Sequence, residues 1–305
     1  MRAFWVGLAA LAALAGGASD ARAQVSTPPK QEGTVSLVFQ NYRHTGHFDR
    51  LGKKNTNGAT RSQVVIAQID FGVTDTFALN VTLPYIASKY TGPDVYFVEG
   101  VETHPGPLDD RAYHAAFQDL RVEGRRMFAM KHVTVTPFAS VSIPTHEYET
   151  QGEAVPGRHR TEFQTGVNAG TELRSFLPGT QIQGGYAYGA LERVNNFSHT
   201  RSNLYVDVGH ALSSRVDVHG MIGWQIAHKR ATVDQLKNDW VNHDRFINSS
   251  FVNVSLGGLF ALTRSTEVYA EWTSTVQGNR GAHVARIIAL GVNRRFGGGF
   301  QGLGR

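Results

Sequence analysis

The chain has 305 residues, no cysteine and a formal net charge of +5. The missing cysteines exclude a disulfide framework, and basic residues interleaved with acidic ones give no nucleic-acid-binding surface. After residue 24 no apolar run approaches the roughly 18 residues that a membrane-spanning helix needs.

Residues 1–23 have the pattern of a secretory signal peptide. Arg2 provides a positive n-region, residues 3–17 form an apolar h-region too short to span a bilayer, and Ala21 and Ala23 are the small residues of a cleavage site before Gln24. We therefore expect residues 1–23 to be removed on export, residues 24–296 to form one domain and residues 297–305 to be a short Gly-rich periplasmic tail.

From residue 34 onward, segments of about ten residues alternate apolar and polar side chains, as strands with one wet and one dry face do. In one of them Phe77, Leu79 and Val81 alternate with Ala78 and Asn80. We predict twelve strands, at about 34–43, 61–71, 76–86, 116–127, 132–144, 161–173, 180–192, 201–211, 215–228, 249–262, 266–277 and 283–296.

The gaps between these strands alternate short and long. Short gaps fall at 72–75, 128–131, 174–179, 212–214 and 263–265, and long ones at 44–60, 87–115, 145–160, 193–200, 229–248 and 278–282. This asymmetry is typical of a membrane barrel with tight periplasmic turns and long extracellular loops. The pattern predicts an all-β fold: a single closed antiparallel transmembrane β-barrel of about twelve strands in the outer membrane of a Gram-negative bacterium. Its expected partners are the lipid bilayer, lipopolysaccharide and the outer-membrane barrel assembly machinery, and both termini are expected in the periplasm.

The last strand ends on Phe296, the kind of terminal aromatic that serves as an assembly signal in outer-membrane barrels. Arg286 and Arg294 share the lipid-facing parity of this strand. Each lies near a strand end, from which it can reach the headgroups. Tyr85, Tyr186, Tyr188 and Trp224 fit the aromatic girdles at the two membrane interfaces.

Several short motifs resemble those of a known family. They are the turn Gly72-Val73-Thr74-Asp75 before a strand ending Leu83-Pro84-Tyr85, then Asp119-Leu120-Arg121, then Ile143-Pro144-Thr145, and the final strand from Ala289 to Phe296. Together they resemble the outer-membrane family named for the MetA pathway of phenol degradation, and the resemblance spans most of the mature chain. It implies passage of small, aromatic or hydrophobic solutes across the outer membrane.

Parity places a set of charged residues toward the lumen. The candidate pathway residues are Asp70, Asp119, Arg121, Glu123, Arg125, Glu172, Asp207, Asp217, His219 and Glu271. They can act as charges that select a solute, or as cross-strand ion pairs that fill a narrow bore. The functional hypothesis is a channel or facilitator, and the alternative is a plugged structural or surface-binding barrel.

Ten of the thirteen histidines lie in or beside the expected extracellular loops, among them His44 and His47. Imidazole binds zinc, copper and nickel, so metal capture at the mouth is a second alternative with these two as candidate ligands. No cofactor and no enzymatic activity is expected. His199 and Ser202 lie three positions apart, which puts them on opposite faces of a regular strand, where they cannot act as base and nucleophile.

Overall fold

A computed structural model describes residues 25–49, 51–93, 96–98, 101–103, 106–195, 197–228, 242, 245–246 and 248–297. The expected signal peptide, and the tail beyond residue 297, lie outside the described residues. Among the described residues, no helix is long and apolar enough to cross a membrane.

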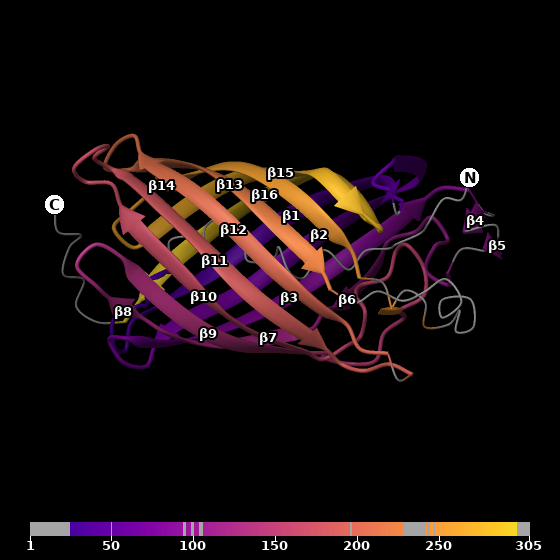
Figure 1. The fold of residues 1–305 in the computed structure, drawn as a ribbon, viewed down its shortest axis with the longest axis horizontal. Coiled ribbons are helices and arrows are strands. Elements are labelled where there is room, and N and C mark those ends of the chain that lie inside the picture. The colour runs from indigo at the N-terminus through magenta and orange to yellow at the C-terminus, as the bar shows by residue number, and fades with distance from the viewer. Residues whose placement is uncertain are drawn as a thin grey trace.

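The chain folds into strands that are numbered in sequence order (Figure 1). They are β1 Gly33–Phe48, β2 Lys54–Gly72, β3 Phe77–Thr91, β4 Tyr96–Val98, β5 Val101–Thr103, β6 His114–Phe117, β7 Leu120–Arg126, β8 Phe128–Ala129, β9 Thr134–Ile143, β10 Glu162–Glu172, β11 Thr180–Leu191, β12 Thr200–Ala211, β13 Val216–Ala227, β14 Ser250–Ala261, β15 Thr266–Asn279 and β16 Gly281–Phe296.

Antiparallel pairing joins these strands into a closed barrel. The order is β1-β2-β3-β7-β9 and then β10 through β16, and β16 pairs back onto β1 from Gly33 opposite Phe296 to Phe48 opposite Gly281. β6 and β7 both pair with β3 and act as one strand that is broken at Gln118 and Asp119. The barrel therefore has twelve strands, as the sequence predicted. Closure matters because every backbone N–H and C=O inside a bilayer must find a partner.

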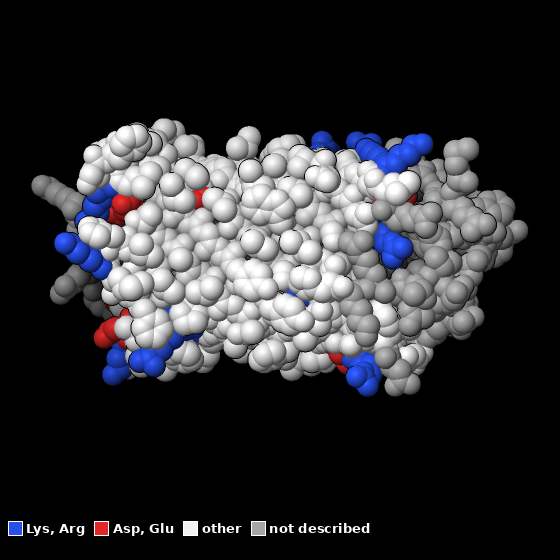
Figure 2. Space-filling model, in the orientation of Figure 1, with Lys and Arg blue, Asp and Glu red and all other residues white. Residues whose placement is uncertain are grey.

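The two ends of the barrel differ. One end has the short turns and β8, and the other has the long connections with β4 and β5 (Figure 1). We call these the periplasmic and the extracellular end, following the rule for transmembrane barrels. Between the ends, outward side chains are mostly uncharged, and on the face in Figure 2 the Lys, Arg, Asp and Glu side chains gather toward the two ends.

The predictions of two long loops are wrong. β1 and β2 continue past the membrane as a paired hairpin, so residues 49–53 replace the predicted loop of residues 44–60. β15 and β16 are separated by Arg280 alone, whose φ of 52° makes the turn, so residues 278–282 form no long loop. In both places the two strands of the hairpin pair through backbone hydrogen bonds, which do not depend on side-chain polarity. The alternation of apolar and polar residues therefore cannot show where such a hairpin ends.

Candidate functional site: the barrel lumen

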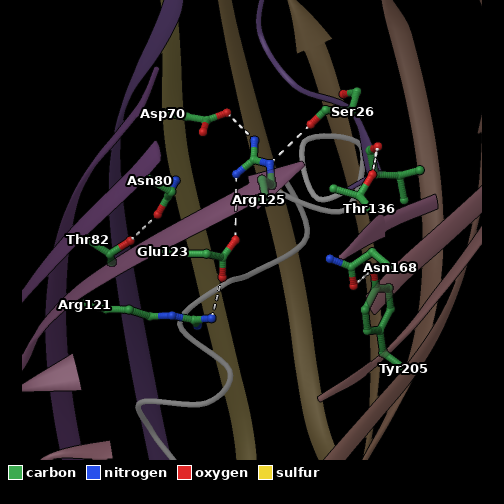
Figure 3. Close-up of polar contacts among 11 residues, drawn as sticks. Ser26, Asp70, Asn80, Thr82, Arg121, Glu123, Arg125, Thr136, Asn168 and Tyr205 are labelled. Atoms are coloured by element: carbon green, nitrogen blue, oxygen red, sulfur yellow. Dashed lines mark hydrogen bonds and ion pairs between the residues drawn. The ribbon is translucent and has the colours of Figure 1, made fainter. Parts of the chain in front are cut away.

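A chain of charged side chains lies on the lumen side of β2 and β7, near the periplasmic end (Figure 3). Arg125 of β7 places Nη2 2.5 Å from Asp70 Oδ2 of β2 and Nη1 3.9 Å from Glu123 Oε1. Glu123 in turn accepts a hydrogen bond from Arg121 Nη2 at 2.7 Å. Strand alternation puts Arg121, Glu123 and Arg125 on one face, and the β2–β3–β7 register brings Asp70 beside them. These four predicted lumen residues form one network.

The segment that precedes β1 enters this end of the barrel. The Thr136 hydroxyl donates to the Val25 carbonyl oxygen at 2.6 Å, and Arg125 Nε donates to the Ser26 carbonyl oxygen at 3.3 Å (Figure 3). Val25 is buried, and its side chain lies against Gly170 of β10. Residues 25–32 therefore occupy part of the periplasmic mouth.

This segment is held against the turn between β2 and β3. The Gln31 N–H donates to the Gly72 carbonyl oxygen at 2.8 Å, and the Gly72 N–H donates to the Glu32 carbonyl oxygen at 2.9 Å. A Cβ at Gly72 would lie 2.2 Å from the carbonyl oxygen of Pro29. Only glycine permits this close approach of the two backbones.

A second network lies on the opposite arc. His219 Nδ1 of β13 is 2.9 Å from Asp207 Oδ2 of β12, and its Nε2 is 3.7 Å from Glu271 Oε2 of β15. Gln183 Nε2 also donates to Asp207 at 3.1 Å, and the Thr273 hydroxyl donates to Glu271 at 2.8 Å. The three predicted lumen residues Asp207, His219 and Glu271 are thus brought together.

A third network was missed by the sequence analysis. Arg201 of β12 donates two hydrogen bonds to the Glu162 carboxylate of β10, one from Nε at 2.8 Å and one from Nη2. Its Nη1 also donates to Gln225 Oε1 of β13 at 3.1 Å. All three side chains are buried. The sequence could have indicated these residues, because Arg201 lies an even number of positions from Asp207 on β12, and Glu162 an even number from Glu172 on β10, which puts each pair on the same face of its strand.

The remaining predicted lumen residues lie at the ends. Asp119 sits at the break between β6 and β7 and accepts a hydrogen bond from the Tyr148 hydroxyl at 2.6 Å. Asp217 is half-buried and is the second residue of β13. Glu172 is wrong as a lumen residue: its exposed side chain pairs with Arg174 at 2.5 Å on the periplasmic rim. It has the inward parity, but it is the last residue of β10 and lies past the lumen.

Part of the lumen wall is apolar, which alternation did not predict. A cluster of buried residues lines one contiguous arc on β1, β2, β3, β15 and β16, and its members are Val38, Tyr42, Val64, Ile66, Ile86, Tyr269, Val284, Ile287 and Ala289. We call it the apolar wall. The lumen of a water-filled porin is polar. This barrel instead packs buried apolar side chains inside its wall, beside the charged networks.

Residues 144–161, between β9 and β10, fold into the extracellular mouth. Asp109, from the connection before β6, accepts hydrogen bonds from the N–H groups of Gly106, Glu153 and Ala154 at 2.8–3.0 Å. Gly152 makes this turn with φ +125°, where a Cβ would lie 2.8 Å from Asp109 Oδ2. Burial raises the pKa of Asp109 to about 6. Glu153 and Ala154 are buried as a result, so the loop fills part of the mouth.

The two candidate metal ligands lie beneath this loop. His47 Nε2 is 3.3 Å from Glu153 Oε2, while His44 is buried and lies beside Tyr42, with ring centroids 6.0 Å apart. Within the ranges that the structure describes, no group of three His, Cys, Asp or Glu side chains is placed to hold a metal ion. The candidate ligands His44 and His47 therefore do not form a metal centre with a described third ligand.

His199 packs edge-on against Phe197, whereas Ser202 is buried beside Tyr186 and His228, so no hydrogen bond joins the two within the described contacts. The Ser202 hydroxyl instead lies 2.7 Å from His228 Nε2 and 2.9 Å from the Tyr186 hydroxyl. Catalysis by such a pair also needs a group that orients the histidine and a site that stabilises an oxyanion. No carboxylate is recorded against His228 in the described part of the chain.

Phe296 is the last residue of β16, pairs with Gly33, and stacks on Phe71 with ring centroids 6.4 Å apart. It closes the seam between the first and last strands at the periplasmic end. This placement leaves its role as an assembly signal a prediction.

No protein-family model matches the sequence, and no curated protein matches it. Solved structures do match in fold. The COG4313 outer membrane channel from Pseudomonas putida F1 aligns with a TM-score of 0.68 and 10% identity over 89% of this chain and 98% of that one. The translocator domain of the autotransporter NalP from Neisseria meningitidis aligns with a TM-score of 0.51 and 10% identity over 88% and 90% of the two chains. The β domain of the Bordetella autotransporter BrkA gives 0.50 and 13% over 88% and 100%. The chain therefore has the fold of outer-membrane β-barrels.

Proposed function

We propose that this protein is an outer-membrane channel or facilitator for small amphipathic solutes, such as aromatic or hydrophobic molecules that carry a polar group. The apolar wall is the observation that carries the proposal. Val64, Ile66 and Ile86 bury apolar side chains inside the barrel, where a channel for sugars or ions would place polar groups. Because these side chains are buried in this state, a solute with an aromatic body would lie on the wall only after the lumen opens, with its polar group toward the Arg201 and His219 networks.

Both mouths contain protein in the structure, which favours a gated facilitator over a permanently open pore. Residues 25–32 lie in the periplasmic mouth and residues 144–161 in the extracellular one. Each is held by hydrogen bonds and by a few buried side chains, among them Val25 and Val155. Their displacement would open a path past the apolar wall.

Uptake by proteoliposomes tests the proposal. A small aromatic carboxylate should enter faster than a sugar alcohol of similar size, because only the aromatic solute gains from the apolar wall. Ile66→Gln should slow uptake of the aromatic solute, whereas Gln164→Asn, on the polar side of the lumen, should not. Equal permeation of the two solutes, or uptake of neither by correctly folded protein, would contradict the proposal.

A further inference from the structure

Four basic side chains form a row on the outside of the barrel, near its extracellular end. In the strand register Arg43 of β1 lies directly opposite Arg286 of β16 and Arg61 of β2, and Arg61 lies opposite Lys89 of β3. The three arginines are exposed and Lys89 is half-exposed. Four neighbouring strands thus each contribute one cation to a single line, which we call the cation row.

The charges of this row are not balanced by the protein around them. β1, β2, β3 and β16 together contain one carboxylate, that of Asp70, and it faces the lumen at the opposite end. Within the described part of the chain none of the four cations forms an ion pair, and Lys89 Nζ lies 5.8 Å from the centroid of the Tyr113 ring. Like charges directly opposite on neighbouring strands destabilise a sheet, so an external anion would relieve a real cost.

The cation row lies about one hydrocarbon thickness away from the periplasmic ends of its strands. On each of the four strands the cation lies about ten to twelve positions from the periplasmic end of that strand. A tilted strand needs about 9–11 residues to cross the hydrocarbon. The cations therefore lie at the level of the outer headgroups, and β1 and β2 continue beyond them into the extracellular space.

The surface below the row is suited to acyl chains. Two layers closer to the membrane centre, Phe39 lies opposite Leu290 and Val65, and Val65 lies opposite Tyr85; all four side chains point outward. An apolar groove of about 640 Å³ lies closer to the periplasmic end, where it spans β13 to β16, β1 and β2 and is lined in part by Leu37, Phe260 and Val292. Polar Asn41 and Gln63 fill the layer between.

We propose that the cation row binds the phosphate groups of a phosphorylated glycolipid of the outer leaflet, that is, lipopolysaccharide. Arginine is well suited to this ligand because its planar guanidinium forms paired, charge-assisted hydrogen bonds with phosphate oxygens. The row is about 14 Å long over three strand spacings, which is wider than a single phosphate group needs. The acyl chains of the same lipid would lie along the outward apolar layer of Phe39, Val65, Tyr85 and Leu290 beneath the row.

Binding of a bisphosphorylated lipid A to delipidated protein in detergent tests this site. Arg43→Gln combined with Arg61→Gln should weaken binding about 30-fold, since each cation near a membrane surface contributes about 1 kcal/mol. Arg43→Lys with Arg61→Lys should retain most of the affinity. The matched control is Arg264→Gln with Arg294→Gln, which removes two positive charges at the periplasmic end and should leave binding unchanged.

Two further probes distinguish the source of the phosphate. Lipid A without phosphate groups should bind the native protein as weakly as bisphosphorylated lipid A binds the glutamine variant, and inorganic pyrophosphate should not compete at concentrations near the lipid affinity. Equal binding of phosphorylated and dephosphorylated lipid would overturn the proposal. Tight binding of pyrophosphate alone would assign the row to a soluble anion instead. Heat-modifiable migration on a gel checks that each variant is folded.

Discussion

Arg125 connects the barrel wall to the segment that enters the periplasmic mouth: its Nη2 lies 2.5 Å from Asp70, and its Nε donates to the Ser26 carbonyl oxygen at 3.3 Å. Arg125→Gln would remove the partner of a buried carboxylate and one anchor of residues 25–32. Breaking a buried ion pair from one side costs about 3–5 kcal/mol. We expect a loss of unfolding free energy of that order, measured by urea titration in lipid vesicles, together with a higher conductance.

Arg121→Gln is the matched control for that variant. Arg121 is partly exposed and pairs with Glu123 but not with Asp70 or Ser26. It should lower the unfolding free energy by about 1 kcal/mol or less, as an exposed pair does. Equal effects of the two variants would show that Arg125 has no special role.

The Glu162–Arg201 pair gives a second stability prediction. Arg201→Met leaves the buried Glu162 carboxylate without its partner and should cost about 3–5 kcal/mol. Adding Glu162→Gln should recover part of the loss, because the uncompensated charge is gone. A double-mutant cycle in urea measures the coupling between the two residues. Additive losses would mean that the two side chains do not interact in the folded barrel.

Ion selectivity tests which carboxylates face the conducting path. Glu123 lies between Arg121 and Arg125, and Glu271 faces His219, so replacing both acids by glutamine leaves the cations in excess. The reversal potential in a salt gradient should shift toward anions. Glu172→Gln is the control, because its side chain lies on the periplasmic rim. A shift of equal size in the control would place the selective charges outside the lumen.

The pH dependence of stability should carry the signature of Asp109. Burial raises its pKa to about 6 in the folded protein, against about 4 for an unfolded chain. The folded state therefore binds more protons between pH 4 and 6, so this group's contribution to stability is complete below about pH 4 and is lost as the pH rises through 6. Asp109→Asn should flatten that part of the curve of unfolding free energy against pH.

Asp110 is the control for this titration. Its hydrogen bond with His114, 2.7 Å long, lowers the pKa of the Asp110 carboxyl, which is the opposite shift. Its contribution is present above the unfolded pKa and is lost as the pH falls below about 4. Asp110→Asn should therefore leave the slope between pH 4 and 6 unchanged. An unaltered slope in Asp109→Asn would contradict the assignment.

The strands were predictable because a membrane barrel imposes a period of two that is visible along the sequence. Phe77, Leu79 and Val81 face outward, and Ala78 and Asn80 are buried inside, as alternation predicts. Asp70, Glu123 and Arg125 were found by the same rule, because inward parity and charge coincide. The alternation rule failed at Glu172. Alternation tells which face of a strand a residue lies on, but it does not tell whether the residue still lies inside the barrel or beyond its rim.

The contacts between distant segments were beyond this reasoning. Thr136 binds Val25 through one hydrogen bond, and Asp109 binds the backbone of Glu153 and Ala154. These segments lie 111 and about 44 positions apart in the sequence. In the long connection predicted at residues 87–115, Asp109 anchors residues 144–161, which enter the mouth. The cation row depends on strand register, and a shift by one residue would turn every second side chain inward.

Conductance of the purified protein in a planar lipid bilayer is the direct test of a channel. We expect discrete conductance steps for the native protein and larger or more frequent steps for Arg125→Gln, because that variant removes one of the anchors that hold residues 25–32 in the periplasmic mouth. A silent membrane for both proteins, with folding verified by heat-modifiable migration, would contradict a channel and favour a filled barrel.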